Sequence, residues 1–388
     1  MEERRRLRRR SPLSIAIADR FSQISSAGWD AATRDGSFFH SAGYLRMFES
    51  ARPANMEPRY ALICDGDTPV AAVCMQIVSV DLSSLGDLKR RRALRKAGAR
   101  VRTRMLVCGN LLVYGLHGVA FAAGADHALI WPAVSEVIYR VRRAEKLAGN
   151  TDIVLLKDFD AAARKDSAVL GKLSYGAVAI EPNMVLAVNP AWQSYQDYLQ
   201  SLVSKFRSDI NSRVFKRFDA AGCTIETLAE VAPYAAELHE LYLQVQGNAR
   251  MRLMTVNADY WPALLAAAGA NGRLHVARRA GRIVGFIVSI RDGETAFAYH
   301  IGFDRATAEE GVPVYLRLLQ ASLAQAIEFG ARRVSFGPTA LSPKARLGCK
   351  PEEAIVWARH RHPFLNRLLQ PMLRLVDHDE APEVDPFK

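Results

Sequence analysis

His300 is the side chain in this sequence best placed for acid–base chemistry. It lies in the aromatic and β-branched run 295–303, which follows the turn signal Asp292-Gly293 and is typical of a β-strand. An imidazole titrates near neutral pH, so His300 is a candidate general base, with a histidine satisfied inside the sheet as the alternative. Its neighbour Tyr299 is a second catalytic candidate. Adjacent strand residues point to opposite faces, so we expect at most one of the two at a common site.

Cationic side chains supply the candidate substrate-binding residues. Lys344 and Arg346 lie in the polar segment 342–348, after a short apolar strand, where long cations can hold a phosphate or a carboxylate. Lys205 and Arg207 lie off the apolar stripe of a predicted helix over residues 195–218. They form either a solvated charged face or a contact with a phosphate-bearing donor or acceptor.

A helix start supplies a further catalytic candidate. Tyr315 stands near the first turn of a predicted helix over residues 315–327, with Pro313 at a position that tolerates proline and Gly330 as the C-terminal cap. Its hydroxyl is a candidate donor to a leaving thiolate, although its spacing also suits a core residue.

The elements that position these residues occur in one order in each half of the chain. That order is a hairpin, a third strand, a helix and a fourth strand. In the second half these elements are predicted over residues 274–278, 283–290, 295–303, 315–327 and 333–336. In the first half they are predicted over residues 59–65, 70–80, 105–114, 130–141 and 152–156. An internal repeat of one architecture is the simplest explanation.

This order resembles the GNAT acyltransferase fold. Segments 192–207 and 344–348 are similar to the divergent group of cellulose-biosynthesis-type acetyltransferases and Fem-type peptidoglycan aminoacyl transferases, which carry two GNAT folds in one chain. The resemblance implies an α/β (α+β) class with tandem GNAT-like folds, each a mixed, mostly antiparallel sheet flanked by helices. It also implies acyl-CoA as co-substrate, with the pyrophosphate at the helix start near Gly311 and Val312. The loop departs from the family's basic, glycine-rich pattern, because Glu309 and Glu310 stand there.

Composition shifts and turn signals set the expected domain organisation. We predict a basic tail (1–12), an N-terminal GNAT-like domain (13–188) with a basic insertion (83–104), a C-terminal acyltransferase domain (189–376) and an acidic flexible tail (377–388). No apolar run of eighteen residues could span a bilayer, and no secretory signal is recognisable. The expected location is therefore cytoplasmic, or peripheral to the inner membrane.

The net charge of +12 is concentrated in short segments rather than spread over the chain. Residues 1–10 carry six Arg against two Glu, and the segment from Lys89 to Arg104 carries nine basic residues and no acid. That segment is either a solvated insertion, a contact with an anionic membrane surface or an RNA contact. A nucleic-acid partner is not expected, because no aromatic side chains interleave with the charges.

Taken together, these features predict an N-acyltransferase that moves an acyl group from acyl-CoA to an amine or hydroxyl. The acceptor is expected to be a small molecule or a cell-envelope precursor, in envelope or exopolysaccharide biosynthesis. Two alternatives stay open: a Fem-type transferase that uses aminoacyl-tRNA, and a non-catalytic scaffold at the membrane surface. No spacing typical of metal ligands occurs, so no metal is expected. Asn110 and His117 are minor candidates in the first half, where a loop role is the alternative.

Overall fold

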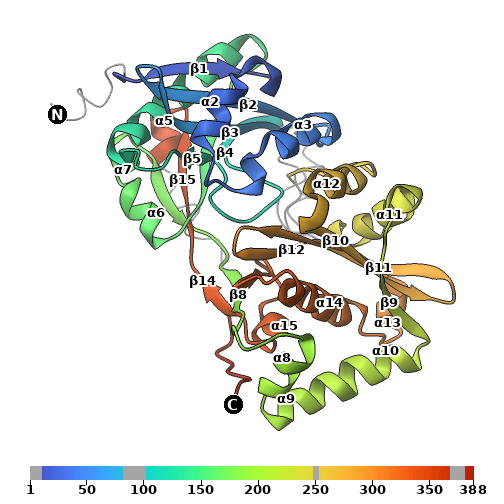
Figure 1. Ribbon diagram of the computed structural model, residues 1–388. Helices are drawn as coiled ribbons and strands as arrows, with labels where there is room; N and C mark the ends of the chain where they lie inside the picture. The colour runs from blue at the N-terminus through green and yellow to red at the C-terminus, as the bar shows by residue number, and fades with distance from the viewer. Residues whose placement is uncertain (1–10, 82–101, 248–252, 368–380) are drawn as a thin grey trace. The chain divides into compact units, whose positions relative to one another are not determined.

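A computed structural model describes residues 11–81, 102–247, 253–367 and 381–388 (Figure 1). Most of the expected basic insertion lies outside these residues. The described chain forms two compact units. The first unit contains residues 11–81, 102–180, 253–256 and 353–367, and the second contains residues 181–247, 257–352 and 381–388.

The first unit is built on an eight-stranded sheet with strand order β1-β2-β3-β4-β6-β15-β7, and with β5 paired to β3. Neighbouring strands are antiparallel except for β4 and β6, which are parallel. The strands are β1 (Ser14–Ala18), β2 (Met56–Asp65), β3 (Thr68–Asp81), β4 (Arg102–Cys108), β5 (Val119–Phe121), β6 (Ile153–Phe159), β7 (Gly176–Ala179) and β15 (Ile355–His360). The α-helices are α2 (Ser26–Ala32), α3 (Ala42–Ala51), α5 (His127–Ala144), α6 (Ala161–Asp166) and α7 (Val169–Lys172).

The second unit is built on a seven-stranded sheet with strand order β14-β8-β13-β12-β11-β10-β9. Here β12 and β13 are the parallel pair. The strands are β8 (Asn183–Ala187), β9 (Cys223–Thr227), β10 (Gly272–Arg279), β11 (Arg282–Asp292), β12 (Thr295–Phe303), β13 (Arg333–Ser335) and β14 (Lys350–Glu352). The α-helices are α8 (Tyr195–Ser201), α9 (Ser204–Asp209), α10 (Lys216–Ala220), α11 (Ala235–Gln246), α12 (Tyr260–Ala268), α13 (Arg305–Glu309), α14 (Val314–Glu328) and α15 (Leu341–Ala345). Helices α11 and α12 lie on one face of this sheet and α14 lies on the other (Figure 1).

The two units share one order of elements, which confirms the predicted α+β class and the tandem arrangement. Strands β2, β3 and β4 form an antiparallel set, and helix α5 leads to β6, which is parallel to β4. In the second unit, β10, β11 and β12 are followed by α14 and by β13, parallel to β12. A helix between parallel strands lets each sheet bury one face under an amphipathic helix.

The contact units do not follow the linear division at residues 188 and 189. The chain passes into the second unit at residue 181, and strand β15 returns to the first sheet. β15 pairs with β6 on one side and with β7 on the other, so it is an interior strand of that sheet. Residues 355–360 therefore belong with the first unit, although they were expected in the C-terminal domain.

The predicted continuous helix over residues 195–218 is wrong at one point. Leu202 and Val203 have extended backbones, with ψ of 145° and 152°. The cause is a pairing with the end of the chain: Leu202 forms a β-bridge with Phe387, and Val203 N–H donates to the Pro386 carbonyl at 2.9 Å. The chain then resumes as α9, a π-helical turn (Ile210–Phe215) and α10.

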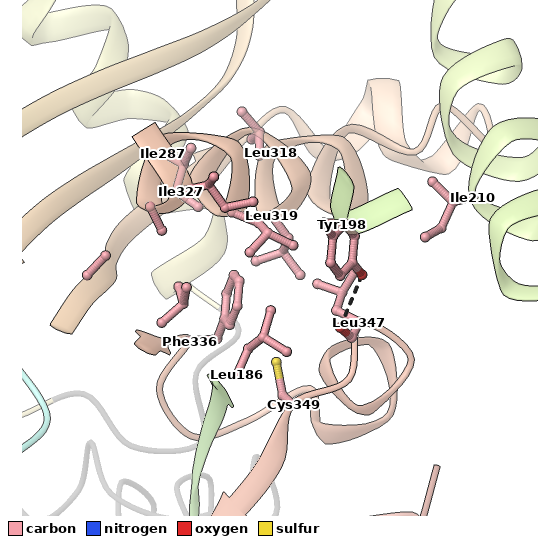
Figure 2. Close-up of a cluster of buried hydrophobic side chains, with 14 of the residues drawn as sticks. Leu186, Tyr198, Ile210, Ile287, Leu318, Leu319, Ile327, Phe336, Leu347 and Cys349 are labelled. Atoms are coloured by element: carbon pink, nitrogen blue, oxygen red, sulfur yellow. Dashed lines mark hydrogen bonds between the residues drawn. The ribbon is translucent and has the colours of Figure 1, made fainter. Parts of the chain in front are cut away.

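The same pairing corrects the prediction of a flexible acidic tail for residues 384–388. The Phe387 ring lies 5.7 Å from Trp192 and 6.3 Å from Tyr198, centroid to centroid. Figure 2 shows the core that this segment borders, where the Tyr198 hydroxyl donates to the Leu347 carbonyl at 3.1 Å. Helix α14 contributes Leu318 and Leu319 to this core.

Among the described helices, none combines the length and apolar character needed to cross a bilayer.

Candidate functional site

A β-bulge in β12 brings Tyr299 and His300 to the same side of the sheet. Val288 is opposite His300 and Ser289 is opposite Ala298, so Tyr299 is an extra residue without a partner on β11. The two rings stack with centroids 4.3 Å apart and an interplanar angle of 21°. The expectation that they point to opposite faces is therefore wrong, because the bulge breaks the period-two alternation of the strand.

His300 accepts a hydrogen bond from an indole. Trp261 Nε1–H donates to His300 Nδ1 at 3.1 Å. An indole N–H can only donate, so this bond occupies the Nδ1 lone pair, and the neutral imidazole carries its proton on Nε2. In this tautomer His300 offers a donor at Nε2 rather than a basic lone pair.

Further aromatic side chains from α11 and α12 surround the imidazole. The rings of Tyr242 and Tyr260 lie 5.8 Å and 5.7 Å from His300. The hydroxyls of Tyr260 and Tyr299 share a hydrogen bond of 2.7 Å. We refer to these five residues, Tyr242, Tyr260, Trp261, Tyr299 and His300, as the β12 aromatic cluster.

The β12 edge beside this cluster is only partly paired with a described strand. Strands β12 and β13 pair only through residues 295–297 and 333–335. Beyond Phe297 the β12 edge that faces β13 has no strand partner in the described chain. An unpaired strand edge can take up an extended ligand by main-chain hydrogen bonds. His300 lies on the part of β12 beyond the pairing with β13.

Residues 304–313 connect β12 to helix α14 and include the short helix α13. Gly311 has φ of +86° and open space where a Cβ would be, while Val312 is buried. The acidic residues of this loop face arginines: Glu310 pairs with Arg279 at 2.6 Å and Glu309 with Arg305 at 3.7 Å. Because these partners lower the local negative charge, the acidic loop is less repulsive to phosphates than its sequence suggests.

Tyr315 lies in the first turn of α14. Its ring lies 6.0 Å from Phe303, at the end of β12, and it packs against the core of the second unit. Burial raises the pKa of Tyr315 to about 12, so the phenol keeps its proton at neutral pH. The packing supports the core interpretation, and the donor role stays a prediction.

Two of the predicted substrate-binding cations, Lys344 and Arg346, have different surroundings. Lys344 is 3% exposed, and its ammonium donates to the carbonyls of Gly337 and Pro338 at 3.0 and 2.8 Å. Arg346 instead pairs with Asp209 at 2.5 Å and stacks on the Phe206 ring. Lys344 thus holds the loop after β13, which is a structural role.

The two other predicted cations lie on α9. Lys205 is exposed, and Arg207 donates to the Leu202 carbonyl at 3.3 Å. Arg207 therefore contributes to the break between α8 and α9. A substrate contact by either residue remains a prediction.

Asn110 and His117 lie in the loop between β4 and β5 and are both buried. The Asn110 amide donates to the Tyr44 hydroxyl at 2.7 Å and accepts from Gln76 at 3.3 Å and from the Leu112 amide at 3.0 Å. Burial holds the pKa of His117 well below its usual range, so its ring is neutral. These contacts support a role of Asn110 and His117 in holding the loop rather than in a functional site.

Sequence reasoning missed Tyr242, Tyr260 and Trp261. The available signal was Tyr260-Trp261-Pro262 at a helix start, where Trp261 supplies an indole donor beside the strand that carries His300. A contact between side chains far apart in the sequence, such as Trp261 and His300, leaves no repeating pattern of apolar residues that could reveal it. The sequence also predicts that the basic segment 248–252 helps to shape the acceptor side, and this segment lies outside the described residues. Among the residues that the structure does describe, no group of three His, Cys, Asp or Glu side chains could hold a metal ion.

The sequence was compared with models of known protein families and with curated proteins. Residues 204–344 match a family model described as an acetyltransferase (GNAT) domain. No curated protein matches the sequence.

Solved structures share the fold at low sequence identity. The crystal structure of FemX is 11% identical, covers 89% of this chain and 98% of its own, and has a TM-score of 0.52. A conserved protein of unknown function from Bacteroides thetaiotaomicron is 13% identical, with 89% and 99% coverage and a TM-score of 0.50. A tandem GNAT protein from the clavulanic acid biosynthesis pathway is 14% identical, with 90% and 99% coverage and a TM-score of 0.46. At these identities the likeness to the first two structures concerns the fold alone.

Proposed function

Because residues 204–344 match a family model described as an acetyltransferase (GNAT) domain, we propose that this chain is an N-acyltransferase whose site is the β12 aromatic cluster and the adjoining edge of β12. The observation that carries the proposal is the hydrogen bond from Trp261 to His300 Nδ1. It fixes the tautomer of an imidazole that lies beside a strand edge able to bind an extended substrate.

The chemistry follows from this tautomer. Acyl transfer joins the acceptor nitrogen or oxygen to the acyl carbon, the bond from that carbon to the donor sulfur breaks, and the proton lost by the acceptor ends on the departing thiolate. Negative charge develops on the acyl oxygen, and a fixed N–H donor in a desolvated setting stabilises it. We propose that His300 Nε2–H is this donor. A base role would require Nδ1 to release the Trp261 hydrogen bond or Nε2 to lose its proton.

Acyl-CoA is the proposed donor substrate. Gly311, Val312 and the start of α14 would hold its phosphates, since backbone N–H groups at a helix N-terminus favour anions. The pairing of Glu309 and Glu310 with arginines fits this assignment. Aminoacyl-tRNA is the alternative donor.

The acceptor and the setting are also proposals. We propose an amine or hydroxyl acceptor, either a small molecule or a cell-envelope precursor, and a cytoplasmic protein that approaches an anionic membrane through residues 89–104. The cluster of five aromatic rings would give the acceptor an apolar wall with hydroxyl groups at defined points.

Two substitutions at one position test the donor role of His300. Glutamine carries an N–H near the Nε2 position, so His300→Gln keeps a donor and removes the base, whereas His300→Ala removes both. We expect His300→Gln to retain at least about tenfold more acyl transfer than His300→Ala, because one oxyanion donor contributes roughly 10²–10³ in rate. The measurement is thiol release from acetyl-CoA and longer acyl-CoAs with a panel of amines.

Equal loss in both variants would contradict the donor role and favour the base. Trp261→Phe is a companion variant that tests the hydrogen bond to His300 Nδ1. It removes the indole N–H and keeps an aromatic ring. We expect it to lower the rate and to change its dependence on pH, because the tautomer is no longer fixed. If no acyl-CoA binds but aminoacyl-tRNA does, the donor assignment fails and the Fem-type alternative stands.

A further inference from the structure

The second unit contains a pocket on the sheet face that carries α14, away from the β12 aromatic cluster. It has a volume of about 260 Å³. One wall is a face of α14 that includes Arg317, Gln320 and Glu328, and another comes from β9 and from His275 on β10. Tyr195 and Phe215 complete the lining. The aromatic cluster contacts α11 and α12, which lie on the opposite face (Figure 1).

Arg317 is a half-buried cation that makes no direct ion pair among the described residues. Its guanidinium lies 4.7 Å from the Phe215 ring centroid and 5.8 Å from that of Phe218. Among the described residues its guanidinium takes part in no ion pair or hydrogen bond, and Asp219 is the acidic side chain whose charge acts on it from a longer distance. Burial lowers the pKa of Arg317, but a guanidinium stays charged at any physiological pH. A desolvated cation of this kind is costly unless an anion accompanies it.

Three buried polar atoms of the same lining have no hydrogen-bond partner, and His275 Nε2 is one of them. Gln320 is 2% exposed, and its Oε1 accepts no hydrogen bond. The Tyr195 hydroxyl is buried and has no partner. Buried polar atoms are satisfied in most proteins, so an acceptor and a donor left open beside an unpaired cation indicate a site built for a ligand.

His275 limits the charge that the site offers. Its Nδ1 shares a hydrogen bond of 2.9 Å with Thr227 Oγ1, and burial lowers its pKa to about 4. The ring is therefore neutral at physiological pH. Arg317 is then the single positive charge in the lining, while Glu226 and Glu328 add negative charge.

We propose that this pocket binds a small carboxylate that carries an N–H or O–H donor next to the carboxylate. The planar guanidinium of Arg317 matches a carboxylate, to which the Tyr195 hydroxyl also donates. The ligand's own donor satisfies Gln320 Oε1. A phosphate dianion fits less well, because Glu226 and Glu328 oppose a second negative charge. The volume lies just below the range of pockets for drug-sized ligands, which indicates a small acid.

A matched pair of probes tests this site on the full-length protein. N-acetylglycine has a carboxylate and an amide N–H, and N-acetylglycinamide has the same shape without the charge. Binding is measured by saturation-transfer NMR titration and by the shift in melting temperature. We expect saturable binding of N-acetylglycine and at least tenfold weaker binding of N-acetylglycinamide, because the neutral amide loses the charge-assisted hydrogen bonds to Arg317 and Tyr195.

Three substitutions locate the binding. Arg317→Met keeps the aliphatic stem over the phenylalanine rings, and we expect it to weaken N-acetylglycine binding at least about tenfold. Tyr195→Phe removes one hydroxyl without changing the packing, so it tests the site even if Arg317→Met fails to fold; we expect severalfold weaker binding. Arg332→Met is the control, since Arg332 is exposed and pairs with Glu294 on the surface. Equal affinity in wild type, Arg317→Met and Tyr195→Phe, or no difference between the two probes, overturns the proposal and leaves a solvated pocket.

Discussion

Lys344 turns its ammonium away from solvent. Its two acceptors, the carbonyls of Gly337 and Pro338, belong to the loop that follows β13. Burial lowers the pKa of Lys344 from 10.5 to about 8. Sequence alone placed this cation after a strand, but the direction of its side chain depends on a loop in which Thr339 and Ala340 have positive φ.

Lys344→Met tests this structural role. The variant leaves two carbonyls without a donor, and we expect the free energy of unfolding to fall by about 1–3 kcal/mol near neutral pH. The pH dependence has a definite sign. Between about pH 8 and 10.5 the unfolded chain binds more protons at this lysine than the folded chain, so this lysine's contribution to stability rises with pH across that window.

Chemical denaturation of wild type and variant near pH 7 and near pH 10 measures both effects. Comparing the two proteins removes the contribution of other titrating groups. Lys350→Met, at an exposed position, is the control. A difference between wild type and Lys344→Met that does not change with pH would contradict the buried, weakened ammonium.

At the scale of elements, the bulge in β12 explains why the site was only partly predictable. The bounds of β12 coincide with the predicted strand 295–303, because a turn and an aromatic, β-branched run define it locally. The extra residue at Tyr299 has no such signal. It depends on the register with β11 and on rings from α11 and α12, which lie far away in the sequence.

Gly302 shows how closely α11 approaches this strand. A Cβ at this position would lie 2.7 Å from the Tyr242 backbone nitrogen and 2.8 Å from the Leu241 carbonyl carbon. Backbone cannot rotate away as a side chain can. We therefore expect Gly302→Ala to destabilise the second unit by about 1–3 kcal/mol, the usual range for overpacking, and to lower acyl transfer by moving Tyr242.

Thermal unfolding and the acyl-transfer assay measure the two effects together. Gly43→Ala is the matched control, because Gly43 lies in helix α3 with nothing within 4 Å of an added Cβ. We expect that control to stabilise by up to about 1 kcal/mol through helix propensity. Wild-type stability in Gly302→Ala would mean that α11 is free to shift.

At the scale of the whole molecule, strand β15 decides how the sequence divides. The local patterns correctly gave the tandem order of elements, since each strand and helix carries its own period. They could not give the exchange of residues 355–360 into the first sheet, because that pairing joins segments about two hundred residues apart, and no local period encodes it.

Trp357 anchors this strand. It is 7% exposed, and its indole N–H donates to Ser167 Oγ at 2.9 Å. We expect Trp357→Ala to cost about 3–5 kcal/mol and Trp357→Phe, which loses mainly the hydrogen bond, about 1 kcal/mol. Hydrogen exchange by mass spectrometry gives the location: β6 and β7 should lose protection while β11 keeps it. Equal loss in β11 would show that the two units unfold together.

Strand β15 also has a consequence for folding on the ribosome. Domains generally fold in the order in which they are synthesised, at roughly 5–20 residues per second. Here the first sheet lacks the strand between β6 and β7 until residue 360 has been made, after the described strands of the second sheet, which end at Glu352. For the roughly 10–40 seconds that synthesis of residues 181–360 takes at this rate, β6 and β7 present unpaired edges to the cell. The first sheet is therefore completed only after the described strands of the second sheet have been made, although most of its chain is synthesised first.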